Sequence, residues 1–160
     1  MGALAQFLLD DHRRLEALLD RAETDGGAYE QFREGLLRHI AMEEKVLLPA
    51  AKKLRGGEPL PVAAQLRLDH SAIAALLVPT PTPAILRQLR EILQLHNPLE
   101  ESKTGLYAEC ERLAKNEIDG LLEKMRAVPK VRVVKHFDGS RAFAAIEDLV
   151  RAAKAGRQSR

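Results

Sequence analysis

The stretch LHNPLEE at residues 95–101 repeats the essentials of the stretch RHIAMEE at residues 38–44. Both have the form His-x-x-x-Glu-Glu. Each is preceded at a similar distance by an Asp-His pair, at residues 11–12 and 69–70. Four of the chain's five histidines therefore belong to one twofold pattern, and a chance match is a poor explanation for it.

The composition fits a single soluble domain made of packed helices. The chain has 160 residues, of which 46% are hydrophobic and 30% charged, enough for one well-formed core. Aromatic residues make up only 4% and Trp is absent, so the core must be rich in Leu and Ala. The net charge of +2 is too balanced to predict binding to nucleic acid. Residues 154–160 are locally basic, and we expect them to be a solvated, frayed end.

Cysteine content and targeting signals give a simple expectation for location. The single Cys110 excludes an internal disulfide and has no partner at the spacing of a zinc or redox site. Charged residues follow Leu8-Leu9 at once, so the N-terminus does not resemble a secretory signal. No apolar run approaches the length of a membrane span. We therefore expect a cytoplasmic protein without a membrane partner.

Apolar residues recur at helical spacing in four successive segments, and each apolar face carries one histidine of the pattern. Glycine-rich and proline-rich turns separate the segments. The segments are roughly residues 3–23, 29–54, 59–77 and 84 onward, the last continuing to Met125 with a break near Gly105. The sequence thus predicts an all-α, up-down-up-down four-helix bundle over residues 1–127.

Two further local features carry structural expectations. Pro98 lies beside the second motif inside a helical pattern, and it predicts a kink or a local bulge because proline removes a backbone hydrogen bond. Residues 128–160 form a C-terminal extension that packs on the bundle or at an interface. Within it, residues 130–137 alternate like a short strand, and a last amphipathic helix follows with its buried stripe at Phe143, Ile146, Val150 and Ala153.

The distances of the four histidines from the predicted turns indicate that they lie at one height of the bundle. In an antiparallel hairpin, residues equidistant from the turn lie side by side. The midpoints of the pairs His12 with His39, Glu43 with His70, and His70 with His96 all fall in predicted turns. Glu43 and the equivalent Glu100 follow their histidines by one helical turn and share their face.

Six polar groups in one apolar layer point to metal. A single histidine on an apolar face is more often a hydrogen-bonded core residue. Two buried carboxylates, however, would be costly unless cations compensated them. Nitrogen and oxygen donors suit iron, manganese or zinc, and their number exceeds one tetrahedral site. They fit two octahedral ions that share both glutamates and keep positions for an oxo or hydroxo bridge and a small ligand. The candidate ligands are His12, His39, Glu43, His70, His96 and Glu100.

This pattern resembles that of the hemerythrin-like HHE cation-binding family, and the resemblance covers about residues 3–115. It implies a four-helix bundle around a non-haem diiron centre, with the six residues named above as ligands. The implied cofactor is two iron ions with an oxo or hydroxo bridge, and manganese or zinc is an alternative.

The chain departs from the oxygen-carrying members of that family at two positions. Ala74 stands where they have a further histidine. Glu100 lies four residues after the last histidine and Glu101 five, whereas those members have an aspartate at five; we favour Glu100 because it copies Glu43. The missing histidine implies exchangeable sites on both irons and makes reversible oxygen carriage a weaker expectation. The site is more similar to that of relatives that sense iron or oxygen, or that handle nitric oxide and repair iron clusters.

The expected function is binding of dioxygen, nitric oxide or peroxide at open iron sites, in sensing or in iron and oxidative or nitrosative stress. A diiron enzyme, an iron donor for iron-sulfur cluster repair and oxygen storage are the alternatives. Bis-histidine haem binding would leave both glutamates unexplained, and a metal-free interaction bundle would tolerate loss of His39 or Glu43. A homodimer or a protein partner is the expected use of residues 129–160.

Acidic neighbours of the motif residues are candidates for a supporting role. A metal-bound imidazole usually donates its second N–H to a carboxylate or carbonyl. Adjacent residues on a helix point about 100° apart, however, which favours a solvent-facing position. The candidates are Asp11, Glu44, Asp69 and Glu101. His136 lies outside the pattern and is interpreted as an ordinary residue of the extension.

Overall fold

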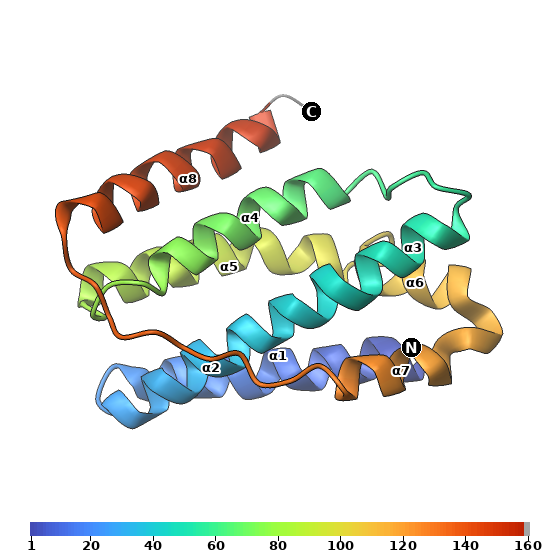
Figure 1. Ribbon diagram of the computed structural model, residues 1–160, viewed down its shortest axis with the longest axis horizontal. Helices are drawn as coiled ribbons and strands as arrows, with labels where there is room; N and C mark the ends of the chain where they lie inside the picture. Colours follow the sequence, from blue (N-terminus) through green and yellow to red (C-terminus); the bar gives the residue numbers. More distant parts are fainter. Residues whose placement is uncertain (159–160) are drawn as a thin grey trace.

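The four periodic segments form an antiparallel bundle in the computed structural model, which describes residues 1–158 (Figure 1). The second helix is continuous through a short π-helical turn, η1, into α3. The bundle helices are α1 (Ala3–Ala22), α2 (Gly26–Met42), η1 (Glu43–Leu47), α3 (Leu48–Leu54), α4 (Ala63–Leu76) and α5 (Pro83–Glu101). This confirms the predicted all-α class.

The bundle turns are set by local residues. Asp25 caps α2, its side chain accepting from the backbone N–H of Gly27 and Ala28. Thr82 caps α5 in the same way, and Pro83 occupies the first turn, where a missing N–H costs nothing. Gly56, with φ of 71°, and Gly57, with φ of 100°, lie in the left-handed region just beyond α3.

The helical irregularity lies beside the first motif rather than the second. The π-helix η1 begins at Glu43, where the N–H of Leu48 bonds to the carbonyl of Glu43, and Pro49 follows at once. A π-turn is a way for a helix to absorb a proline that cannot donate. In contrast, α5 stays α-helical past Pro98 to its end at Glu101. Of the two alternatives predicted at Pro98, the local bulge is wrong, and the kink stays a prediction.

The chain continues beyond α5 as α6 (Leu106–Ala114), the short 3₁₀ turn η2 (Lys115–Glu117) and α7 (Ile118–Arg126). The predicted break at Gly105 is confirmed. A Cβ atom at residue 105 would lie 2.7 Å from the carbonyl oxygen of Leu99. Only glycine therefore lets this turn pack so closely against the end of α5.

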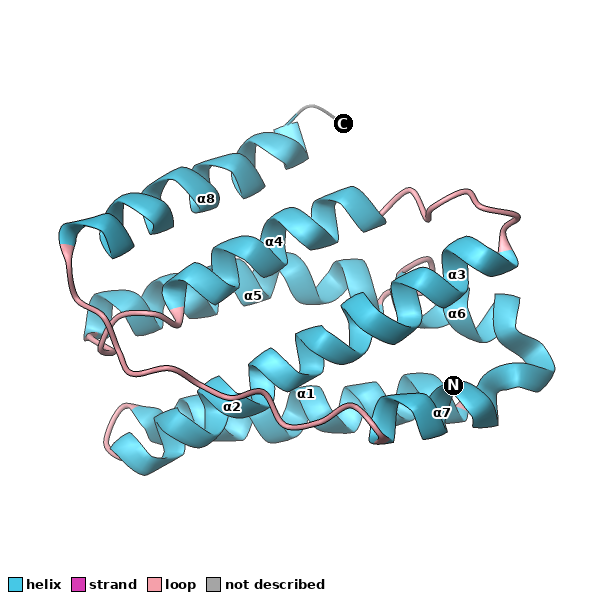
Figure 2. Cartoon of the chain, in the orientation of Figure 1, coloured by secondary structure: helices cyan, strands magenta, loops and turns pink. Residues whose placement is uncertain are grey.

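Residues 130–137 do not form the predicted strand. They run as an extended loop across the bundle (Figure 2), and no strand occurs within residues 1–158. A strand needs a partner strand, and residues 130–137 have other partners: Arg33 donates to the carbonyl of Val134 at 2.7 Å, and the N–H of Phe137 donates to the carbonyl of Val78 at 3.0 Å. Just before the loop, Arg38 donates to the carbonyl of Val128 at 3.0 Å. The alternation of apolar and polar residues alone could not distinguish a strand from an extended loop.

The last helix, α8 (Ser140–Gln158), packs along α4 (Figure 1). Ile146 and Ala153 are buried as predicted, whereas Phe143 is 44% exposed. The basic end is helical through Gln158 and Arg157 is paired with an acidic residue, so the expectation of a frayed end is wrong for residues 154–158. The remainder of that segment, 159–160, lies outside the described residues.

The core consists of two apolar clusters along the bundle axis. The Tyr107 cluster contains Leu4, Leu8, Met42, Leu66 and Tyr107 among others. The Phe32 cluster contains Leu15, Phe32, Leu36, Ile73 and Leu89 among others. On α1, α2 and α4 the pattern histidine lies between residues of the two clusters. Among residues 1–158, no helix combines the length and apolar character needed to cross a membrane.

Candidate metal centre

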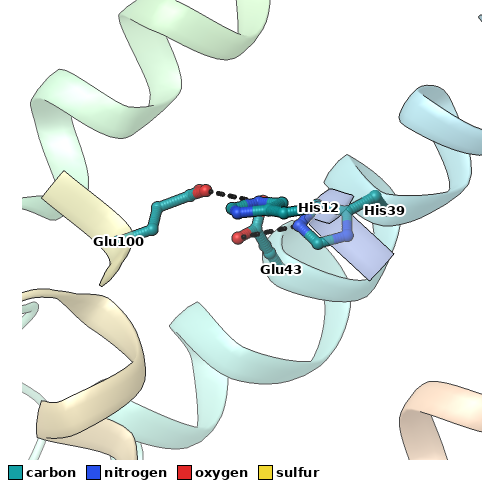
Figure 3. A group of neighbouring side chains, drawn as sticks. All are labelled: His12, His39, Glu43 and Glu100. Atoms are coloured by element: carbon teal, nitrogen blue, oxygen red, sulfur yellow. Dashed lines mark ion pairs between the residues drawn. The ribbon is translucent and has the colours of Figure 1, made fainter. Parts of the chain in front are cut away.

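The six predicted ligands converge in the middle of the bundle and form two groups. The first group is His12, His39, Glu43 and Glu100, and the second is Glu43, His70, His96 and Glu100. The ligand atoms of each group lie within 4.8 Å of one another. Figure 3 shows the first group, with both carboxylates pointing toward the two imidazoles. Glu101 belongs to neither group.

The two glutamates stand between the two pairs of histidines. Oε2 of Glu43 is 3.5 Å from Nε2 of His39, and its Oε1 is 3.4 Å from Nε2 of His70. Oε1 of Glu100 is 3.2 Å from Nε2 of His12, and its Oε2 is 2.9 Å from Nε2 of His96. Each carboxylate thus presents one oxygen to each histidine pair, which is the disposition of a bridging ligand.

The burial of the centre and the missing hydrogen-bond partners of its polar atoms indicate that it is suited to bind cations. Both glutamate side chains are fully buried. Glu43 Oε1, Glu100 Oε2 and His70 Nε2 are buried and make no hydrogen bond of proper geometry, although nitrogen and oxygen atoms of the centre lie 2.9 to 3.5 Å apart there. Buried polar atoms without partners are rare because each costs about 1 to 3 kcal/mol. All three atoms belong to the second group, where a metal ion would be their common partner.

A ring of carboxylates orients the four imidazoles. In every case Nδ1 is bonded to an acidic side chain, so Nε2 points to the centre. The four bonds are His39 to Asp11 at 2.8 Å, His70 to Glu44 at 2.8 Å, His96 to Asp69 at 2.9 Å and His12 to Glu101 at 2.5 Å. We call these acids the carboxylate ring. The expectation of a solvent-facing position is wrong for Asp69, which is buried, whereas Asp11 and Glu44 are half-buried and Glu101 is exposed. All four nevertheless bond to an imidazole on another helix.

The order of these bonds closes on itself. Asp11 of α1 holds the imidazole on α2, and Glu44, directly after the start of the π-turn, holds the one on α4. Asp69 of α4 holds the imidazole on α5, and Glu101 at the end of α5 returns to α1. Each Asp-His or Glu-Glu pair in the sequence therefore serves two helices.

The electrostatics of the metal-free centre favour charged pairs. Burial lowers the pKa of His12, but the hydrogen bonds that its imidazole donates to Glu100 and Glu101 outweigh burial and raise the pKa to about 10. The same balance raises the pKa of His70 to about 12 and that of His96 to about 9. Burial raises the pKa of Glu100, yet His96 and the other imidazoles hold it well below its usual range. A metal ion bound at Nε2 would compete with these protons.

A tyrosine that the sequence did not suggest also reaches the centre. Tyr107, on α6, is 1% exposed. Its Oη lies 2.9 Å from Glu43 Oε2, 3.0 Å from His12 Nε2, 3.1 Å from His39 Nε2 and 3.2 Å from Glu100 Oε1. Burial and the two nearby carboxylates raise its pKa well above the usual value. No local motif marks this residue, because its position depends on the turn at Gly105.

A cavity of about 310 Å³ reaches the centre from the side of the Phe32 cluster. Its polar wall includes His12, His39 and His96. Its apolar wall includes Leu15, Leu36, Phe32 and Ile73. Exposed Arg13 and Glu16 also line it, which places one part near solvent. The volume lies at the small end of ligand sites.

The C-terminal helix touches the support of the centre directly. Arg157 of α8 places Nη1 and Nη2 each 2.6 Å from an oxygen of Asp69. Gln65 donates to the same carboxylate at 2.9 Å and to the carbonyl of Ala153 at 2.9 Å. The acid that holds His96 is thus shared between the bundle and α8.

The two remaining candidates lie outside the centre. His136 bonds to the carbonyl of Pro79 at 3.0 Å and to Glu30, and it belongs to neither histidine group. Cys110 is buried, and burial together with nearby acids raises the pKa of its thiol to about 12, so it stays a neutral core residue.

These features define a class of protein: a four-helix bundle whose interior holds two histidine groups joined by shared carboxylates. The chain matches the hemerythrin HHE cation binding domain over residues 3–104, and it belongs to that family. No curated protein and no solved structure gives a significant match. The protein is a metal-binding, hemerythrin-like helical bundle.

Proposed function

We propose that the protein binds two iron ions bridged by Glu43 and Glu100, together with an oxo or hydroxo bridge, and takes up a small ligand at an open iron position. One observation carries this proposal. Each of the two buried carboxylates directs one oxygen to each histidine pair, which matches two ions and exceeds what one ion needs. Bound iron would supply the redox chemistry.

The donor set supports iron without excluding its neighbours. Imidazole and carboxylate donors suit iron, manganese and zinc alike, and the thiol of Cys110 lies outside both groups. Two octahedral ions would use all six donors. One tetrahedral zinc ion would use four and leave the other buried donors without a partner. Metal analysis is therefore the deciding measurement.

The cavity supports a small ligand. Its volume is at the small end of ligand sites, and beside the centre residues it is lined by apolar side chains such as Leu15, Leu36 and Ile73. Polar residues outside the centre, such as Arg90 and Gln94, line other parts of it. Dioxygen, nitric oxide and peroxide are small enough to enter such a space. The role we propose is sensing or stress handling with one of these molecules.

The contact with α8 supports sensing in particular. A change in the position of His96 is passed to Asp69, which accepts from Arg157 through both oxygens. Asp69 is buried, so it cannot substitute water for a lost partner at low cost. The state of the centre can thereby alter how firmly α8 binds to α4.

The test of the metal centre is metal analysis of full-length protein from iron-replete cells. We expect about two irons per chain, from the two-ion count above, and an optical spectrum that changes on adding azide or nitric oxide. Glu43→Ala should reduce the content below one iron per chain, since it removes a donor from both groups. The adjacent Glu44→Gln keeps all six donors and should retain both ions at saturating iron. One iron per chain, or stoichiometric zinc, would refute the diiron assignment.

The test of sensing is hydrogen exchange in α8. We expect its amide protection to differ between the iron-free, iron-bound and ligand-bound forms. Arg157→Gln should remove this difference while leaving the iron content unchanged. Equal protection of α8 in all three forms would rule out a reporting role for this helix.

A further inference from the structure

We propose that Tyr107 is a metal ligand, its phenol oxygen completing the coordination of the ion held by His12 and His39. This inference rests on the proposed diiron centre. Tyr107 lies on α6, beyond residues 3–104 that match the family, so the family match does not assign it a role.

The distances around the phenol oxygen are those of neighbouring ligands. With metal–ligand bonds of about 2.1 Å, adjacent vertices of an octahedron lie about 3 Å apart. Each vertex has four such neighbours. Oη of Tyr107 has four donor atoms at 2.9 to 3.2 Å, and they are the four donors of the first group. A hydroxyl group that made only one hydrogen bond would not need to lie at nearly equal distances from all four donor atoms.

The backbone holds Tyr107 in this place. Gly105 approaches the carbonyl oxygens of Leu99 and Glu100 so closely that a Cβ atom would lie 2.7 to 2.8 Å from them. The chain can therefore reverse directly after α5 and begin α6 beside the centre. The ring of Tyr107 is then packed in the Tyr107 cluster, on the opposite side of the centre from the cavity.

The second group has no equivalent of Tyr107. Its atoms Glu43 Oε1, Glu100 Oε2 and His70 Nε2 are buried and have no hydroxyl donor beside them, and their contacts with one another and with His96 lack hydrogen-bond geometry. In contrast, Glu43 Oε2 and Glu100 Oε1 of the first group both bond to the phenol. One ion would therefore have five protein donors and the other four. The asymmetry arises from α6, not from the bundle helices.

This asymmetry assigns the ligand-binding position. The ion at His70 and His96 keeps one more exchangeable position than the ion at His12 and His39. The absence of a histidine at Ala74 suggested two equally open ions, and Tyr107 changes that expectation. On ligation the metal takes the place of the phenol proton, which leaves to solvent.

The chain offers a well-matched pair of variants, because it has only two tyrosines. Tyr29 is also 1% exposed, belongs to the Phe32 cluster and has a buried hydroxyl without a partner. In a Tyr29→Phe protein, Tyr107 is the sole tyrosine. Any iron–phenolate vibration in the resonance Raman spectrum of that protein must then come from Tyr107.

We expect the ferric wild type and Tyr29→Phe to show a visible phenolate-to-iron charge-transfer band, with phenolate modes enhanced on excitation in that band. Tyr107→Phe should lose both signals and still bind two irons through the six remaining donors. If wild type and Tyr29→Phe hold two irons without the band, or if Tyr107→Phe keeps it, Tyr107 is not a ligand. A wild type without two irons would instead refute the diiron centre itself. If Tyr107→Phe loses iron, the Raman spectrum of Tyr29→Phe alone decides.

Discussion

Arg157 grips Asp69 with both terminal guanidinium nitrogens, each 2.6 Å from a carboxylate oxygen. One of these oxygens also accepts from Nδ1 of His96 at 2.9 Å. Burial raises the pKa of Asp69, but its bonds to His96, Arg157 and Gln65 lower it below the usual value. A fully buried carboxylate is thus held between a centre residue and the last helix of the chain.

Removing this arginine should destabilise the protein. We expect Arg157→Gln to lower the free energy of unfolding by about 1 to 3 kcal/mol, because a buried carboxylate loses its cationic partner. Urea denaturation of both proteins measures the change. The control is Arg151→Gln, which removes an exposed pair with Glu147 on the same helix and should cost less than about 0.5 kcal/mol. Equal effects of the two changes would contradict a specific role for Arg157.

The carboxylate ring should control metal affinity. Asp11→Asn keeps the size of the side chain but removes the charge that orients His39, and we expect iron affinity to fall about 10-fold to 100-fold. Competition with a chelator measures the affinity. The neighbouring Asp10→Asn is a matched control, because Asp10 bonds only to exposed Gln6 and Arg13. The idea fails if the two variants bind iron equally well.

The cavity should limit how fast a small ligand reaches the centre. Leu93 lines the cavity and is partly buried, so Leu93→Phe should narrow it and slow azide binding severalfold without changing iron content. Stopped-flow absorbance measures the rate. Leu95 lies on the same helix but outside the cavity and is 47% exposed, so Leu95→Phe should leave the rate unchanged. An unaltered rate in Leu93→Phe would mean that ligands use another route.

The close turn at Gly105 should decide whether Tyr107 reaches the metal. Gly105→Ala places a Cβ atom 2.7 Å from the Leu99 carbonyl, which must push α6 away. We expect the phenolate band to weaken or vanish in this variant.

Gly120→Ala is the control for that change. A Cβ atom at Gly120 meets nothing within 4 Å, and the residue lies inside α7. Alanine there should keep the band and stabilise the protein by up to about 1 kcal/mol. If Gly105→Ala keeps the full phenolate band at equal iron content, the close turn at Gly105 does not determine the position of Tyr107.

The sequence predicted the bundle and the gathering of six side chains because both depend on local, repeated signals. Helical periodicity located the bundle helices, and glycine-rich and proline-rich turns located the breaks between them. The positions of His12, His39, His70 and His96 relative to the turns were then enough to place them in one layer. Their role as metal ligands stays a prediction, as does the division at residue 127.

What the sequence could not predict depends on contacts between distant segments. The orientation of each acid in the carboxylate ring was predicted from its own helix alone. Its hydrogen bond, however, is made to an imidazole on another helix. Residues 130–137 alternate as a strand does, but the carbonyl of Val134 accepts from Arg33 of α2 and the N–H of Phe137 donates to the carbonyl of Val78, and neither partner is a strand. Tyr107 and Arg157 reach the centre from helices whose placement no periodicity reveals.

The closed order of the carboxylate ring has a mechanical consequence. Sliding one helix by a single residue moves it about 1.5 Å along its axis. Such a slip would break two imidazole bonds at once, one that the helix makes through its acid and one that it receives through its histidine. The register of the four helices and the aim of the four imidazoles therefore enforce each other, and neither can drift while the other holds.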